Sequence, residues 1–194
     1  SENTKVLKIF NNKKIKSILT KKSCLNGTER CSEALRSIKK SYSNFLIVSC
    51  DMPFLNLNLI RFLLRKKVYL GSKVDAITVH RKIVNKKVLS DKSVAKIVFN
   101  KNNEVLFLSR NSIPSNNKNL KINYYSHHGL VLIKTDVLKK YKILKNSNLQ
   151  LAEDNEWLKF IENGYRIKSF LYNNISPEIN NKNDLKKYYN SIEV

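Results

Sequence analysis

The run Phe45–Val48 constrains the fold most, because it has four consecutive apolar side chains. In a strand these side chains alternate between the two faces, so neither face of the strand is suited to contact with water. Such a strand is buried on both faces, which is typical of a parallel sheet covered by helices. Pro53 has no N–H to donate to a sheet ladder, so we expect the strand to end at about Asp51. Ligands of open α/β sheets bind at the carboxyl ends of strands. Asp51 is therefore either a ligand-binding carboxylate, or a solvated acid at the strand end or a cap for the helix predicted from Asn56.

Helical and strand patterns alternate along the rest of the chain. Apolar periodicity predicts helices over 4–14, 26–42, 56–67, 135–141, 151–164 and 181–192, and strands over 16–20, 74–82, 127–134 and 165–172. We expect a hairpin over 94–110 with a turn at Asn100–Asn103, followed by a polar loop over 111–121. Thr28 and either Thr135 or Asp136 are the expected helix caps. The predicted architecture is a three-layer α/β fold with a mainly parallel sheet and an antiparallel excursion.

The chain is strongly basic, with a formal net charge of +22 over 194 residues. Its lysines are scattered over every segment together with many Asn, Ile and Tyr residues, the profile expected from an A/T-rich coding sequence. We therefore interpret the charge as compositional drift and do not expect nucleic acid to be a partner. No apolar run approaches the ~20 residues of a membrane span. Cys24, Cys31 and Cys50 lack metal-ligand spacing and fit a reduced cytoplasm better than a disulfide framework.

Four motifs follow one another along the chain: Gly-Thr-Glu-Arg at 27–30, Asp-x-Pro at 51–53, Ser-Arg-x-x-Ile-Pro at 109–114 and His-x-Gly at 127–129. In order and spacing this set resembles the 3-deoxy-D-manno-octulosonate cytidylyltransferases, also called CMP-Kdo synthetases, over essentially the whole chain. The resemblance implies a Rossmann-like fold of the nucleotide-diphospho-sugar-transferase type. It also implies an enzyme that uses Mg2+, couples Kdo to CTP, releases pyrophosphate, and serves lipopolysaccharide assembly as a cytoplasmic homodimer.

The resemblance assigns the metal and nucleotide sites to particular residues. It makes Asp51 a catalytic Mg2+ ligand and places Asn180 where the family has a second metal-binding Asp. Mg2+ prefers one or two carboxylates and completes its shell with phosphate and water. The implied nucleotide-binding residues are Gly27, Thr28, Glu29, Arg30 and Ser49. The alternative for residues 27–30 is an ordinary capped helix with a surface arginine.

The sugar site implied by the resemblance lies on later motifs. Arg110 is the second implied catalytic residue, and its forked guanidinium suits the carboxylate of Kdo, although a strand-end arginine is otherwise commonly a solvated charge. His127 is expected to face the sugar, whereas His128 lies on the opposite strand face and is expected to be structural. Glu153 and Glu156 share a helix face and are the expected partners of Kdo hydroxyls, the alternative being two solvated acids.

The chain also departs from the family pattern. We expect residues 1–194 to form a single cytidylyltransferase-like domain that lacks the first strand-helix unit, which carries the family's phosphate loop. Val131 stands in place of a sugar-side Tyr, and Trp157 in place of a polar residue. Two alternatives therefore stay open. The first is a related nucleotidyltransferase, since "CDMPFL" is also similar to molybdenum-cofactor guanylyltransferases, and the second is a non-catalytic basic binding module.

Overall fold

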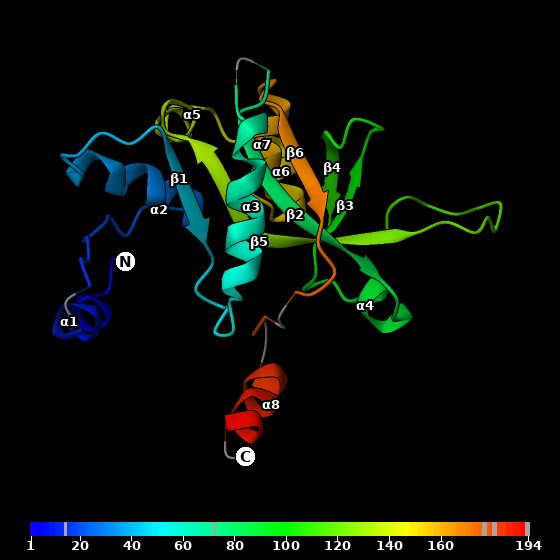
Figure 1. The fold of residues 1–194 in the computed structure, drawn as a ribbon, viewed down its shortest axis with the longest axis horizontal. Coiled ribbons are helices and arrows are strands. Elements are labelled where there is room, and N and C mark those ends of the chain that lie inside the picture. Colours follow the sequence, from blue (N-terminus) through cyan, green and yellow to red (C-terminus); the bar gives the residue numbers. More distant parts are fainter. Residues whose placement is uncertain (14, 72, 176–177, 180–181, 193–194) are drawn as a thin grey trace.

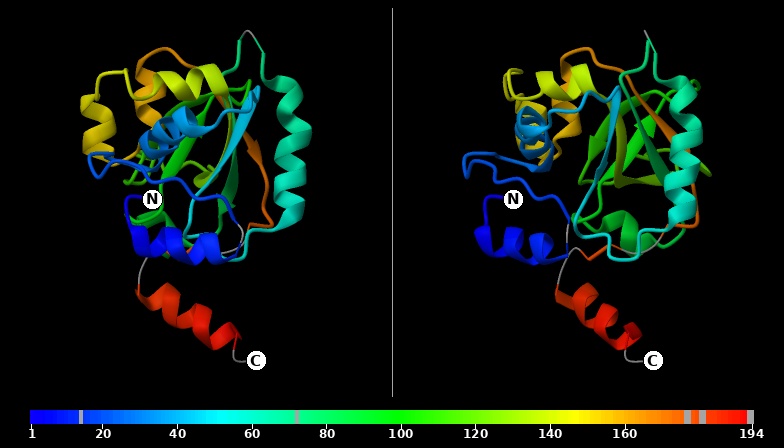
Figure 2. Two further views of the ribbon diagram at one scale, coloured as in Figure 1. Left: turned by 90° about the vertical axis from the view of Figure 1, so that its left-hand side faces the viewer. Right: turned by 60° about the vertical axis from the view of Figure 1, so that its left-hand side comes forward.

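A mixed β-sheet lies between two layers of helices in the computed structural model of the chain (Figures 1 and 2). The structure describes residues 1–13, 15–71, 73–175, 178–179 and 182–192. Helix α3 (Leu57–Arg65) covers one face of the sheet. Helices α2 (Gly27–Ala34), α5 (Thr135–Lys140) and α7 (Trp157–Glu162) lie on the other face. The expected three-layer α/β fold is confirmed.

The sheet has six strands among the described residues, in the order β4-β3-β5-β2-β6, with β1 paired to β5 as well. Their bounds are β1 Asn44–Val48, β2 Ala76–Ile83, β3 Lys96–Phe99, β4 Val105–Ser109, β5 Tyr124–Lys134 and β6 Ile167–Leu171. Strand β5 pairs antiparallel with β1, β2 and β3, and β3 pairs antiparallel with β4. The pairing of β2 with β6 is parallel.

The expectation of a mainly parallel sheet is therefore wrong in strand direction. Strands β1, β2 and β6 share one direction, but β5 runs the opposite way between β1 and β2. The run Phe45–Val48, on which the expectation rested, is not buried on both faces, since β1 is half-buried and Val48 is 42% exposed. The run that is buried on both faces is Leu130–Ile133 of the antiparallel strand β5, so a continuous apolar run does not predict strand direction.

Each face of the sheet carries its own apolar cluster. Leu59 and Leu63 of α3 pack one turn apart against the face that includes Ile77 of β2. The neighbouring residue Ala76 points to the other cluster, where it meets Phe160 of α7. Successive strand residues point to opposite faces, which divides one strand between two clusters. Each fully buried large apolar side chain contributes about 1.5–3 kcal/mol to folding.

Helix α2 begins one residue after Asn26, whose side chain accepts a hydrogen bond from the Glu29 N–H at 2.9 Å. Asn26, and not Thr28, is therefore the N-cap. Helix α5 has no side-chain cap: Thr135 Oγ1 donates to the Tyr42 carbonyl instead. Helix α2 continues only as the 3-10 turn η1 (Leu35–Ser37), so the helix predicted over 26–42 is shorter than expected.

Several other predicted elements differ from the structure. Residues 16–20 form no strand, and α4 (Lys86–Ser90) was not predicted. The helix predicted over 151–164 is two helices, α6 (Asn148–Glu153) and α7, because Asp154 between them adopts a left-handed conformation with φ 44°. Asp and Asn tolerate that conformation better than most residues. The break turns the residues that follow Asp154 toward the sheet.

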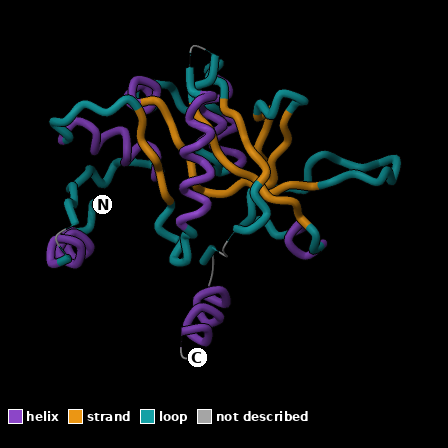
Figure 3. The backbone as a smooth tube through the Cα atoms, viewed as in Figure 1, coloured by secondary structure: helices purple, strands orange, loops and turns teal. Residues whose placement is uncertain are grey.

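The remaining elements agree with their predictions. They are α1 (Thr4–Asn12), α3 with its 3-10 extension η2 (Lys66–Tyr69), the hairpin of β3 and β4, and α8 (Lys182–Ile192). Asn103 in the predicted hairpin turn has φ 62°, and its N–H donates to the Asn100 carbonyl. The polar segment 111–121 is a loop that projects from the sheet (Figure 3). In the described part of the chain, no helix is both long and apolar enough to cross a membrane.

Candidate functional site

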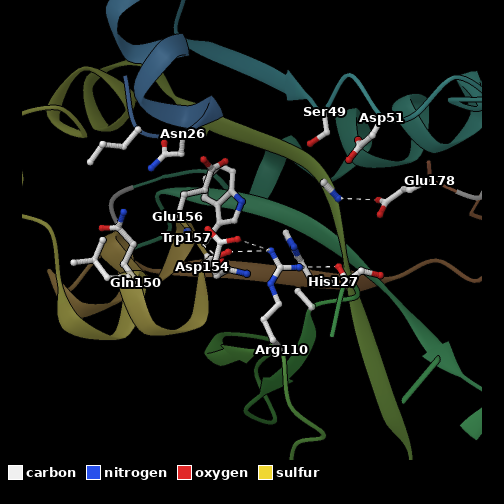
Figure 4. A pocket seen from close by; sticks show the side chains of 16 residues that line it. Asn26, Ser49, Asp51, Arg110, His127, Gln150, Asp154, Glu156, Trp157 and Glu178 are labelled. Carbon is white, nitrogen blue, oxygen red and sulfur yellow. Dashed lines mark hydrogen bonds and ion pairs between the residues drawn. The ribbon is translucent and has the colours of Figure 1, made fainter. Parts of the chain in front are cut away.

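A cavity of about 470 Å3 lies where β1 and β4 end, beside the break between α6 and α7 (Figure 4). Its volume is in the range of small-molecule sites. Three elements line it with groups predicted from the sequence: the loop after β1 with Ser49 and Asp51, the end of β4 with Arg110, and β5 with His127. Glu156, the residue before α7, adds a further carboxylate. The structure therefore brings five of the predicted site residues to one cavity.

Asp51 carries an unsatisfied acceptor in this cavity. Its Oδ1 is buried and accepts no hydrogen bond from any residue that the structure describes. Burial raises the pKa of Asp51, and the negative charge of Glu178 raises it further. An unpaired buried carboxylate oxygen is costly, and a bound cation would remove the cost.

Glu178 was missed by the sequence analysis because it belongs to no motif. The Ile179 N–H donates to the Asp51 carbonyl at 2.8 Å, which brings the Glu178 segment to the end of β1. Glu178 Oε1 lies 2.6 Å from His128 Nδ1 and accepts from the Gly129 N–H at 3.4 Å. His128 is buried and does not line the cavity; it holds Glu178 there instead.

Ser49 and Gly129 bring β1 close to β5 in the cavity wall. A Cβ atom on Gly129 would lie 2.6 Å from Ser49 Oγ, far inside van der Waals contact. The Ser49 N–H donates to the Gly129 carbonyl at 3.3 Å. A larger residue in place of the glycine of the His-x-Gly motif would therefore displace the Ser49 side chain.

Arg110 reaches the cavity from the end of β4. Its guanidinium donates to the Ser93 carbonyl at 2.7 Å and to the Asp154 carbonyl at 3.0 Å. Lys96 holds the backbone of the same region, because its buried Nζ donates to three carbonyls, those of Asp91, Val94 and Arg110. The hydrogen bonds of the guanidinium and those of Lys96 together fix the position of the Arg110 side chain.

Glu153 does not line the cavity with Arg110 and His127. Its carboxylate accepts from Ser109 Oγ at 2.9 Å and from the Arg110 N–H at 2.8 Å. The structure therefore places Glu153 under the end of β4, where it orients the backbone of Arg110. Its contact with a sugar hydroxyl stays a prediction.

His127 and Glu156 both line the cavity but differ in their surroundings. His127 Nε2 lies 3.1 Å from Thr78 Oγ1, and burial lowers its pKa, so the ring is neutral near pH 7. Glu156 accepts from the Thr28 N–H at 3.0 Å and from Thr28 Oγ1 at 2.6 Å. Burial raises the pKa of Glu156, and the hydrogen bonds from Thr28 oppose that increase. Glu156 therefore links α7 to the start of α2.

The Gly-Thr-Glu-Arg segment contributes less to the cavity than expected. Gly27 lies beside the Glu156 carboxylate, but neither Glu29 nor Arg30 lines the cavity. Glu29 accepts from the Leu25 N–H at 3.0 Å, while Arg30 pairs with Glu2 at 2.6 Å and donates to Thr20 Oγ1 at 2.8 Å. Nucleotide contacts of these two residues stay predictions.

Asn26 and Gln150 are further cavity residues that the sequence analysis missed. Asn26 was predicted only as the first residue of a helix. In the structure its Nδ2 donates to Tyr141 Oη at 2.9 Å. Gln150 is 5% exposed, and its Oε1 has no hydrogen-bond partner among the described residues. No sequence pattern distinguishes Gln150 from a surface helix residue. Its free amide can donate to and accept from a ligand at once.

A divalent cation fits the acids at the end of β1. The described residues include no group of three or more His, Cys, Asp or Glu side chains suited to a metal ion. Mg2+ does not need one, because it takes one or two protein carboxylates and completes its shell from phosphate and water. Asp51 with its unpaired oxygen meets that requirement. Asn180, the other expected ligand, lies outside the described residues.

Comparison with known proteins relates the chain to cytidylyltransferases in every case described below. Residues 1–170 match the family model described as cytidylyltransferase. The chain is 31% identical over 190 residues to the 3-deoxy-manno-octulosonate cytidylyltransferase of Bacteroides thetaiotaomicron, an alignment that covers 93% of this chain and 74% of that protein. It is 32% identical over 174 residues to the mitochondrial protein of that name from Arabidopsis thaliana, covering 88% of this chain and 59% of the relative.

A third relative of the same name, from Fusobacterium nucleatum, is 30% identical over 152 residues, covering 78% of this chain and 61% of that protein. The chain thus spans about three fifths of the length of the Fusobacterium and Arabidopsis proteins.

Solved structures share the fold at lower sequence identity. A CMP:2-keto-3-deoxy-manno-octonic acid synthetase complexed with CTP is similar with a TM-score of 0.87 and 22% identity, over 98% of this chain and 78% of that one. The inositol-1-phosphate CTP transferase from T. maritima is similar with a TM-score of 0.59 and 16% identity, over 100% and 72%. These similarities confirm the expected Rossmann-like nucleotidyltransferase type of fold.

Proposed function

Since the chain belongs to the cytidylyltransferase family, we propose that it activates Kdo with CTP, giving CMP-Kdo and pyrophosphate. The observation that carries the proposal is the cavity itself. It combines a carboxylate that has one buried, unpaired oxygen with a guanidinium and a neutral imidazole, from Asp51, Arg110 and His127. A nucleoside triphosphate and a sugar acid need this combination of cation-binding and anion-binding groups.

The reaction forms a bond between a Kdo hydroxyl oxygen and the α-phosphorus of CTP and breaks the bond from that phosphorus to the bridging oxygen of pyrophosphate, while the hydroxyl proton leaves to solvent. Catalysis of such a transfer depends on positioning the reactants and stabilising charge. Arg110 has donors that can take the Kdo carboxylate in a forked geometry. His127, being neutral, offers one donor and one acceptor to a hydroxyl. Glu156 and Thr28 hold the opposite wall of the cavity together.

Mg2+ is the proposed cofactor, with Asp51 as its protein ligand and Asn180 as the second position implied by the family pattern. When bound, the ion would neutralise charge on the triphosphate and the leaving pyrophosphate. The unpaired Oδ1 of Asp51 supports this assignment. Ser49 and Gly27 are proposed to lie beside the nucleotide, because they line or border the same cavity.

The cellular setting is part of the proposal. We place the protein in the cytoplasm and in lipopolysaccharide assembly, the use that CMP-Kdo implies. We also propose a homodimer, supported by apolar side chains such as Leu106 on the hairpin and Leu120 on the loop, which are 55% and 60% exposed. Exposed apolar patches mark interfaces.

The test is calorimetric titration of CTP and of Kdo, with Mg2+ present, into protein expressed from the complete open reading frame, together with chromatographic detection of CMP-Kdo. Arg110→Lys should weaken Kdo binding by about tenfold or more with little change for CTP, because an ammonium cannot reproduce a bidentate contact. Arg36→Lys, at an exposed position in η1, is the matched control. A wild-type protein that binds neither ligand but binds RNA with a steep salt dependence would instead be a basic binding module.

A further inference from the structure

Glu178 occupies a position in the cavity that the motif-based assignment does not use. It faces the same space as Asp51, on the side where β1 ends (Figure 4). Asp51 lies in the loop that follows β1, whereas Glu178 lies in the segment that follows β6. The Ile179 N–H bond to the Asp51 carbonyl fixes these two distant segments to each other.

The carboxylate of Glu178 is held in a fixed orientation. His128 Nδ1 and the Gly129 N–H both contact its Oε1, at 2.6 Å and 3.4 Å. None of the hydrogen bonds found among the described residues uses Oε2. Metal-binding carboxylates are commonly oriented in this way by a hydrogen-bonded partner, so that one oxygen is fixed and the other is presented to the ion.

Two acids, Asp51 and Glu178, line the same cavity. The sequence contains 37 Lys and Arg residues, yet no Lys or Arg among the described residues forms an ion pair with Asp51 or Glu178. Both acids are half-buried, and the absence of a lysine or arginine partner in the described part of the chain leaves room for an external cation between them.

We propose that Glu178 supplies the second carboxylate of the Mg2+ site at Asp51, in place of the acid that the family pattern has at Asn180. Asp51 and Glu178 would hold the ion, and His128 is a positioning residue that acts through Glu178. An asparagine brings no charge to a Mg2+ site, and Glu178, two residues earlier in the chain, restores the missing charge. The inference rests on the proposed function for the identity of the ion, but the acidic pair can be tested without CTP or Kdo.

The experiment is titration of the protein with Mn2+ as a probe for the Mg2+ site, followed by electron paramagnetic resonance of the free ion, with and without CTP. Glu178→Gln keeps an oxygen acceptor for His128 and Gly129 and removes only the charge. We expect it to weaken Mn2+ binding by at least about tenfold, as Asp51→Asn should. Mg2+ should displace the bound Mn2+ from the wild type.

Three comparisons keep the test decisive. Glu162→Gln, an exposed acid at the end of α7, should bind Mn2+ like the wild type. Glu178→Asp retains a carboxylate, so its affinity should lie between those of the wild type and Glu178→Gln; it also serves if the Gln variant folds poorly by circular dichroism. Asn180→Ala should change the affinity less than twofold.

The inference is overturned if Glu178→Gln binds Mn2+ like the wild type, if Asn180→Ala abolishes binding, or if the wild type binds no Mn2+ with or without CTP. Failure of the proposed function looks different. In that case Mn2+ binding depends on Glu178 and Asp51, but neither CTP nor Kdo binds.

Discussion

Replacement of Lys96 by Met tests whether a buried ammonium organises the region around Arg110. Lys96 is 0% exposed, and its Nζ donates to the carbonyls of Asp91, Val94 and Arg110 at 2.7, 2.8 and 2.6 Å. Met has an unbranched stem of similar length, so Lys96→Met retains most of the packing and removes the charge and the donors of the ammonium. The Asp91 carbonyl still accepts from the Val94 N–H at 3.2 Å, so the variant leaves two carbonyl oxygens, those of Val94 and Arg110, without a donor among the described residues.

The size of the effect follows from those two acceptors. Each buried acceptor left without a donor costs about 1–3 kcal/mol. Val94 is half-buried, so water can reach part of this loop and the cost stays below the upper figure. Burial also lowers the pKa of Lys96, which shows that the folded protein bears a desolvation cost that the variant avoids. A net loss of about 2 kcal/mol in the free energy of unfolding remains.

Thermal unfolding followed by circular dichroism measures this loss. For a chain of this size, about 2 kcal/mol corresponds to a decrease in Tm of roughly 4–8 °C. Lys101→Met, at an exposed position in the β3–β4 turn, is the control and should change Tm by less than about 2 °C. Kdo binding should also weaken in Lys96→Met, because the Arg110 carbonyl loses its donor. An unchanged Tm for Lys96→Met would refute the reasoning.

Three further predictions concern single side chains. Asp51→Asn should abolish CTP binding that depends on Mg2+ while the circular dichroism spectrum stays unchanged. If calorimetric titration of CTP into the variant gives the affinity of the wild type, Asp51 does not have this role. Burial lowers the pKa of His80 to about 4, so the unfolded chain binds more protons between pH 6.5 and 4 and stability falls as pH decreases through that window. His80→Gln should flatten this decline in urea midpoints, and an unchanged slope would count against it. Gln150→Leu removes a buried oxygen without a partner, so it should keep or raise Tm yet weaken ligand binding, and a lower Tm would indicate a structural role for the amide.

Much of the site could be predicted from local sequence. The apolar run Phe45–Val48 followed by Pro53 predicted a strand that ends at about Asp51; β1 ends three residues earlier, at Val48, and Asp51 lines the cavity from the loop that follows. Alternation of side chains along β5 separated His127, which lines the cavity, from His128, which does not. Periodicity, turn chemistry and strand alternation depend on residues that are close in the chain, so the sequence contains them directly.

The remainder was decided by how distant segments pack. Arg30 has the residue type of a nucleotide ligand, yet its guanidinium pairs with Glu2. The Glu153 carboxylate accepts from the Arg110 N–H at the end of β4 and does not line the cavity. Strand β5 is antiparallel to both of its neighbours β1 and β2, which only the pairing of distant strands reveals. Glu178 reaches Asp51 through a single backbone hydrogen bond made by its neighbour Ile179. Such contacts join residues far apart in the chain, and they form only when burial of both sheet faces has fixed the layers, so no local pattern records them.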